Sequence, residues 1–204
     1  SALPEQFISY CDALEVSIPP LPEFLQDFTL DRMDPVLKPE PGGFDQLNSF
    51  IEEVKAAVAE KAPSATVITI VMETLAWGLK FDRVLLLLRN KVTNQLIGRT
   101  LIGQSHADPK SIVRAIKQGS DRFAPDAKAL REERPVFNGD SIFANGWPIV
   151  ALPVGLGENC IGVIYADRLC VDLASDGELS EREKAAVSIM TELINKSLEY
   201  PQKP

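Results

Sequence analysis

The chain has 204 residues, of which 45% are hydrophobic and 25% are charged, values typical of a soluble globular protein. Its net charge of −8 is concentrated in residues 1–43, which hold eight acidic and two basic side chains, so the remainder lacks the basic surface of a nucleic-acid-binding protein. The three cysteines show no CxxC spacing and the only histidine is His106, which argues against a disulfide framework, a zinc site and a catalytic site with two imidazoles. We therefore expect no metal, no cofactor and no nucleic-acid partner.

Residues 1–43 form an acidic extension that contains seven of the fifteen prolines and cannot be one long helix. Large apolar side chains such as Phe7, Phe24 and Phe28 nevertheless favour burial. The neighbouring surface could belong to the following domain, to an upstream domain or to another subunit, and the sequence leaves these alternatives open.

Two helices are predicted next. Apolar residues recur at spacings of three and four from Phe44 to Val58, and Pro63 interrupts the pattern. Ser64 is then expected to cap a second helix, which ends near Gly78. The stretches FDRVLLLL and LIGRTLIG, separated by the turn NKVTNQ, indicate two antiparallel strands joined as a hairpin.

The stretch 108–134 is less regular, with helix-like pieces at PKSIVRAIKQG and PDAKALREE, and RPVFNGDSIFANG indicates a loop or a short strand. A second hairpin is predicted from the strand WPIVALPVG, the turn LGEN and the strand CIGVIYADR. Ser180 and Glu183 have the spacing of a capping box, which predicts a last helix that runs to about Tyr200.

This order of elements predicts an α+β domain with a central antiparallel sheet, its N- and C-terminal helices on one face and the irregular segment on the other. No apolar run approaches the roughly 20 residues of a membrane span, and the first ten residues do not resemble a secretory signal. We therefore expect a cytoplasmic protein that does not enter a membrane.

Over roughly residues 44–200 the sequence resembles a GAF domain, a small sensory module. The resemblance is carried by FDRVLLLL with its hairpin, by WPIVALPVG-LGEN-CIGVIYADR and by the capped helix ELSEREKAAVSIMTELINKSLE. Residues 1–43 further resemble the segment that joins an HD-related output domain to a C-terminal GAF-like domain in bacterial signalling proteins. The resemblance implies a regulatory module of a bacterial signal-transduction protein, with an upstream signalling domain.

In the GAF architecture the first and last strands are antiparallel neighbours in the middle of the sheet. This arrangement would gather Asp82, Arg83, Asp167 and Arg168 at one sheet edge. Opposite charges on facing strand positions stabilise pairing and oppose register slips. We interpret the four residues as a structural charge cluster, with a ligand or catalytic site as the alternative.

Three functions are compatible with this fold. The first is the binding of a small molecule between the sheet and the segment 104–147, where the candidate lining residues are Arg99, Arg122, Phe123, Asn145 and Trp147. The second is homodimerisation through the helices at 44–60 and 180–198, with or without a ligand. The third is catalysis, which we do not expect: some GAF-like proteins reduce methionine sulfoxide with several cysteines, but residues 61–159 contain none.

Overall fold

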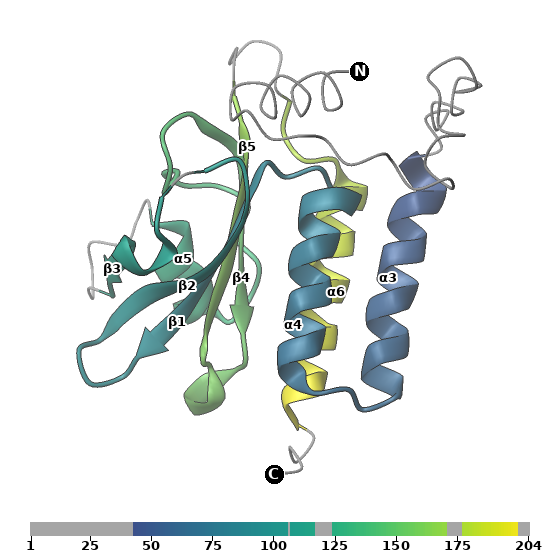
Figure 1. Cartoon of the computed structure of the whole chain (residues 1–204), viewed down its shortest axis with the longest axis horizontal. Coiled ribbons are helices and arrows are strands. Elements are labelled where there is room, and N and C mark those ends of the chain that lie inside the picture. The colour runs from purple at the N-terminus through teal and green to yellow at the C-terminus, as the bar shows by residue number, and fades with distance from the viewer. Residues whose placement is uncertain (1–42, 106, 117–123, 171–176, 200–204) are drawn as a thin grey trace, which may run out of the picture. The chain divides into compact units, whose positions relative to one another are not determined.

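A computed structural model describes residues 43–105, 107–116, 124–170 and 177–199, all of which fall within one unit of the chain, Gly42–Pro204. A five-stranded antiparallel sheet carries three long helices on one face and a short helix on the other (Figure 1). The predicted α+β class and the layer of terminal helices are therefore confirmed. No helix in these four ranges is long and apolar enough to cross a membrane.

The elements follow the predicted order closely. The helices are α3 (Gly43–Ala59), α4 (Ser64–Glu73) with the π-helical turn η2 (Thr74–Gly78), α5 (Pro125–Glu132) and α6 (Glu181–Glu199). The strands are β1 (Arg83–Asn90), β2 (Gln95–Gly103), β3 (Val113–Ala115), β4 (Gly146–Val154) and β5 (Gly162–Leu169). Two 3-10 turns, η3 (Pro109–Ser111) and η4 (Gly157–Asn159), precede β3 and β5.

The sheet has the order β3-β2-β1-β5-β4, so β1 and β5 lie side by side at its centre. Successive side chains of a strand point to opposite faces of the sheet. Most side chains of both strands are buried, because a core covers each face. Ile164 and Ala166 pack in the core beneath the helices, whereas Val163 and Tyr165 pack in a second core on the opposite face. This double coverage explains why CIGVIYADR is apolar at nearly every position.

The helix layer is formed by α3, α4 and α6, and their apolar stripes pack against the sheet and one another (Figure 1). On α6 the stripe is largely used inside the domain, since Met190 and Ile194 are fully buried. Ile189 is the large apolar side chain of α6 that stays exposed, at 38%. Most of the apolar side chains of α6 that the sequence suggests for dimerisation are therefore buried in the core of the domain.

Two local predictions are wrong. PKSIVRAIKQG begins as the turn η3 and the edge strand β3, rather than as a helix, because its backbone pairs with β2 and its β-branched residues favour a strand. Ser64 does not cap α4; it is the first helical residue, Pro63 occupies the cap position, and the Ser64 hydroxyl donates a hydrogen bond to the Ser197 carbonyl of α6 at 3.1 Å. The hydroxyl therefore links two helices instead of ending one.

The capping box at the start of α6 is confirmed. The Ser180 backbone N–H donates to the Glu183 carboxylate at 2.8 Å, and the Glu183 N–H donates to the Ser180 hydroxyl at 3.3 Å. The same carboxylate also forms an ion pair with Arg168 of β5. Glu183 therefore joins the last helix to the sheet as well as capping it.

We expect Glu183→Gln to lower the free energy of unfolding at neutral pH by about 1–2 kcal/mol, because the amide can still accept the capping hydrogen bond from Ser180 but loses the charge-assisted contact with Arg168. Partial burial alone raises the pKa of Glu183, but hydrogen bonds from Arg168 and Ser180 outweigh it and leave the pKa below its usual value. A lowered carboxyl pKa stabilises the fold above about pH 4.3, and this contribution is lost as the pH falls through the folded-state value. Urea unfolding at several pH values should show a smaller acid loss for the variant than for the natural chain. An identical acid loss in both would contradict the assignment.

Candidate functional site

The end of the sheet where β1 begins and β5 ends contains a buried polar cluster. Arg83 and Asp167 face each other across these strands, and Nε of Arg83 lies 2.6 Å from Oδ1 of Asp167. The other carboxylate oxygen accepts hydrogen bonds from the Tyr165 hydroxyl at 2.8 Å and the Ser141 hydroxyl at 3.0 Å. The Arg83 guanidinium also lies over the Phe143 ring, 4.9 Å from its centroid. The loop before β4 is thereby fixed to the sheet.

Burial dominates the electrostatics of this cluster. The side chains of Arg83 and Asp167 are 6% and 0% exposed. Desolvation raises the pKa of the Asp167 carboxyl, an effect that hydrogen bonds from Arg83 and Tyr165 partly offset. Desolvation likewise raises the pKa of the Tyr165 hydroxyl, and the nearby Asp167 charge adds to it. A phenol held in this way is a hydrogen-bond donor and not a base at neutral pH.

The other two residues of the predicted charge cluster lie at the same end of the sheet but have separate partners. Asp82 accepts a hydrogen bond from the Leu169 backbone N–H at 2.7 Å. Arg168 pairs with Glu183 and donates to the Leu79 carbonyl at 2.8 Å. The structure therefore brings together one buried ion pair and two further attachments between strand ends, helix and loop, rather than a four-charge network.

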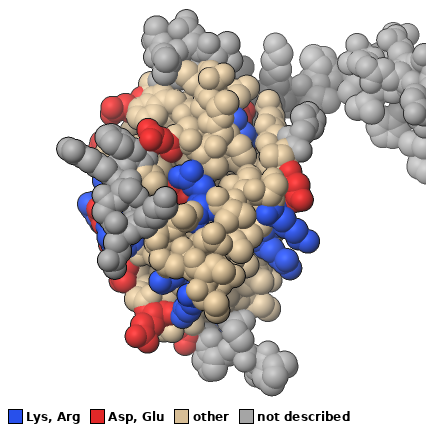
Figure 2. Space-filling view, turned by 90° about the vertical axis from the view of Figure 1, so that its left-hand side faces the viewer, with Lys and Arg blue, Asp and Glu red and all other residues tan. Residues whose placement is uncertain are grey.

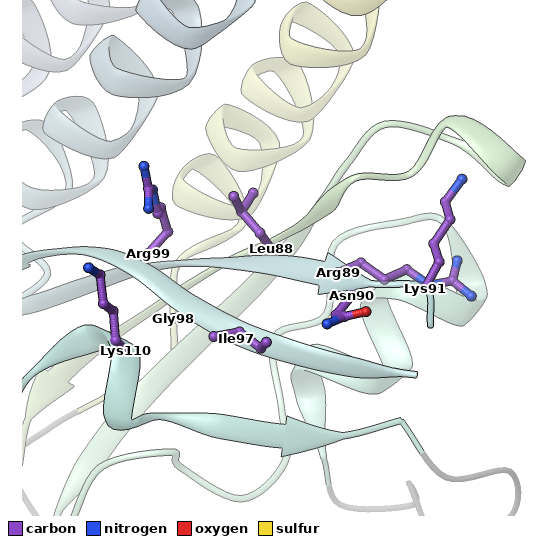
Figure 3. Close-up of a pocket in the computed structure, with 8 residues that line it drawn as sticks. All are labelled: Leu88, Arg89, Asn90, Lys91, Ile97, Gly98, Arg99 and Lys110. Carbon is purple, nitrogen blue, oxygen red and sulfur yellow. The ribbon is translucent and has the colours of Figure 1, made fainter. Parts of the chain in front are cut away.

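A groove of about 560 Å³ lies along the β1–β2 hairpin (Figure 3). Its apolar floor comes from Leu88 and Ile97, which are direct partners across the two strands. Arg99 is the extra residue of a β-bulge, because Leu86 pairs with Thr100 and the next residue pairs with Gly98. Figure 3 shows the Arg99 and Leu88 side chains pointing to the side of the sheet on which the helices lie.

Four of the residues that line the groove are basic, Arg89, Lys91, Arg99 and Lys110. None of them pairs with a carboxylate among the described residues, although Lys91 donates a hydrogen bond to the Glu158 carbonyl at 2.7 Å. Nε of Arg89 is buried without a hydrogen-bond partner in the described part of the chain. Cations elsewhere, such as Arg114 with Asp126, do form ion pairs. The basic residues of the groove differ from these cations in having no ion-pair partner among the described residues.

Lys110 reaches the groove because Gly98 has no side chain. A Cβ atom at Gly98 would lie 2.1 Å from the carbonyl oxygen of Pro109, and the Gly98 N–H donates to the Ile112 carbonyl at 2.9 Å. This close approach places η3 directly on β2. Asp108 fixes the turn by accepting a hydrogen bond from the Lys110 backbone N–H at 3.0 Å. The Lys110 ammonium forms no ion pair with the described residues.

The three predicted pocket residues that the structure describes are not gathered in one place. Arg99 lines the groove, whereas Trp147 packs against the core on the opposite face of the sheet and Asn145 is an exposed residue of positive φ before β4. Arg122 and Phe123 lie outside the described residues, as does His106. A pocket between the sheet and the segment 104–147 therefore stays a prediction.

Sequence reasoning did not identify Arg89, Lys91 and Lys110 as site residues. Arg89 and Lys91 could have been found as basic residues flanking the hairpin turn NKVTNQ, next to the apolar strand that supplies Leu88. Lys110 had no such signal, because only the packing of η3 on Gly98 places it over the groove.

Lysine and arginine side chains lie near the middle and at the margins of the face that carries the β2–β3 edge, together with aspartate and glutamate side chains and uncharged surface (Figure 2). No group of three or more His, Cys, Asp or Glu side chains within the four described ranges is placed to hold a metal ion. Cys160 is buried with its thiol directed at the Gly162 carbonyl, and desolvation raises the pKa of this thiol.

Solved structures with the same architecture define the class of fold. A free methionine-R-sulfoxide reductase from Neisseria meningitidis is similar over 75% of this chain and 88% of its own, with a TM-score of 0.56 and 12% identity. The GAF domain of a phosphoenolpyruvate-protein phosphotransferase from Coxiella burnetii covers 74% and 91%, with a TM-score of 0.54 and 12% identity. A segment of a methyl-accepting chemotaxis protein covers 73% and 94%, with a TM-score of 0.50 and 12% identity.

The chain therefore has a GAF fold. No family model matches the sequence, and no curated protein matches it either. The relationship is one of structure, and the same fold is found in an enzyme and in domains of signalling proteins.

Proposed function

We propose that this domain is a non-catalytic sensory module of a bacterial, cytoplasmic signal-transduction protein, and that it binds a small molecule in the groove along the β1–β2 hairpin. The carrying observation concerns Leu88, which lines the groove and also packs against the core beneath the helices. A ligand that contacts Leu88 therefore acts on the helix layer directly. Differential binding to two packings of that layer would shift their populations, which is the physical basis of a sensor.

The burial of Cys160 supports a non-catalytic role. Cys160 is inaccessible and its raised pKa keeps the thiol protonated, whereas a reactive cysteine needs an exposed thiolate. Residues 61–159 supply no other thiol. The sulfoxide reductase with a similar fold is thus a precedent for the architecture and not for the chemistry of this chain.

Native mass spectrometry of the chain, purified gently from the cells that make it, tests this proposal. We expect an added mass that disappears on denaturation and that is reduced in the variant Leu88→Asn. The matched control is Val92→Asn, a change of an exposed residue in the hairpin turn. A chain that carries no added mass from cells grown in several conditions would contradict the proposal.

Homodimerisation is the second candidate function, and the exposure of Ile189 on α6 favours it. In a dimer formed through the terminal helices, Ile189→Asp should give a monomer in size-exclusion chromatography with light scattering. Met190→Asp is not a useful test, because that side chain is fully buried and the change would unfold the domain. A dimer that survives Ile189→Asp would move the interface away from α6. In either arrangement, we propose that residues 1–43 connect this domain to an upstream signalling domain.

A further inference from the structure

We propose that the ligand of the hairpin groove is a small molecule with several phosphate groups and an apolar body. This inference rests on the proposed sensory function and adds the chemical class of the ligand. Four observations lead to it: the charge of the groove, the arrangement of that charge, the apolar floor and the volume.

The positive charge of the groove indicates that its ligand is an anion and suggests how many negative groups the ligand carries. Arg89, Lys91, Arg99 and Lys110 contribute four positive charges, and no described carboxylate pairs with any of them. Cations held close together repel one another, and an anion between them relieves this repulsion. A single carboxylate or phosphate would leave most of the charge uncompensated. Polyphosphates supply three or four negative charges within a few bonds.

The arrangement of the basic side chains suits oxygen atoms on several phosphates. In the view of Figure 3, Arg99 and Lys110 lie toward one end of the groove and Arg89 and Lys91 toward the hairpin end, where the Arg89 side chain extends along β1 away from Leu88. Each end therefore combines one guanidinium, which presents a planar fork of N–H donors, with one ammonium, which acts as a point charge.

The apolar floor and the volume limit the rest of the molecule. Leu88 and Ile97 lie between the two charged ends, and both are only partly buried by the protein. About 560 Å³ is within the range of sites for metabolites and drug-sized ligands. A nucleic acid would need a continuous basic stripe, and residues 44–204 are slightly acidic as a whole. An isolated groove of this size is better suited to one small polyanion.

Isothermal titration calorimetry with the whole chain at low salt tests the assignment. The probes are inorganic triphosphate, ATP, AMP and adenosine, which separate the contribution of charge from that of the apolar body. We expect ATP and triphosphate to bind at least about tenfold more tightly than AMP, since one lost charge-assisted contact costs about this factor. Adenosine should give no detectable binding. Affinity should fall as salt is raised, because ions screen exposed charges.

Variants link the binding to the groove. Arg99→Gln and Lys110→Gln should each weaken triphosphate binding by about tenfold, and both side chains are exposed enough that the fold is expected to survive. Lys91→Gln serves as a further variant if either of these melts early. The matched control is Lys55→Gln, which removes one positive charge from α3, in the helix layer.

Two results would overturn the inference. One is binding of adenosine as tight as that of ATP, and the other is absence of binding by all four probes. Failure of the inference is distinguishable from failure of the proposed function by native mass spectrometry. A retained mass without phosphorus would leave the sensory function standing and reject the polyphosphate, whereas no retained mass together with no binding would reject both. Unchanged affinity in Arg99→Gln and Lys110→Gln would place any phosphate site outside the groove.

Discussion

Replacing Arg83 by alanine is expected to lower the free energy of unfolding by about 3–5 kcal/mol, the range measured when one partner of a buried ion pair is removed. The reason is the position of Asp167, whose side chain is fully buried. Without Arg83 the carboxylate loses its cation but cannot reach water. It must then either stay charged in an apolar environment or take up a proton, and both alternatives destabilise the fold.

Chemical denaturation followed by circular dichroism measures this loss. The matched control is Lys55→Ala, which breaks the exposed ion pair with Glu52 on α3 and should cost less than about 1 kcal/mol. The double variant Arg83→Met with Asp167→Leu should recover part of the loss, because an apolar pair of similar volume leaves no buried charge. If Arg83→Ala left the melting temperature unchanged and abolished ligand binding, the cluster would be a ligand site and not a structural one.

The change Gly98→Ala is expected to cost about 1–3 kcal/mol, as overpacking does in well-packed regions, and to weaken triphosphate binding as much as Lys110→Gln does. The added methyl group would lie 2.1 Å from the Pro109 carbonyl oxygen, so η3 has to move off β2. That movement breaks the hydrogen bond from Gly98 to Ile112 and takes Lys110 away from the groove. Stability and anion binding are thus coupled through one backbone contact.

Gly177→Ala is the control for this variant, because a Cβ atom there would have no neighbour within 4 Å. Melting temperature and triphosphate affinity should both stay close to those of the natural chain. Normal affinity in Gly98→Ala, measured on a correctly folded sample, would show that η3 does not position Lys110 for binding. A loss of stability equal to that of Gly177→Ala would contradict the close packing of η3 on β2.

Local patterns predicted most of the fold because the signals were local. The apolar run of β5, the turn LGEN and the Ser180–Glu183 capping box each depend on residues near one another in the chain, and each is found where it was expected. Local patterns wrongly predict a helix over residues 109–116, because an edge strand depends on its partner. The strand β3 forms only where β2 offers free backbone groups.

In the candidate site, too, some features could be predicted from local sequence and others depend on tertiary contacts. The chemistry of Arg83 and Asp167 was visible in the sequence, and the register of β1 against β5 was inferred from the resemblance to GAF domains. The groove was not visible, because its four cations come from the end of β1, the turn that follows it, the bulge in β2 and the turn η3.

The sequence by itself determined the class of fold, the order of most of its elements and the charge that the chain carries, because periodicity, capping and turn chemistry act over a few residues. Tertiary structure decided which charges meet. In the folded domain Arg83 forms an ion pair with Asp167, and Arg168 forms one with Glu183. The cations of the hairpin groove have no carboxylate partner among the described residues. The physical reason is that electrostatic partners are chosen by distance and burial in space, and both depend on strand register and on contacts such as that of Gly98 with Pro109.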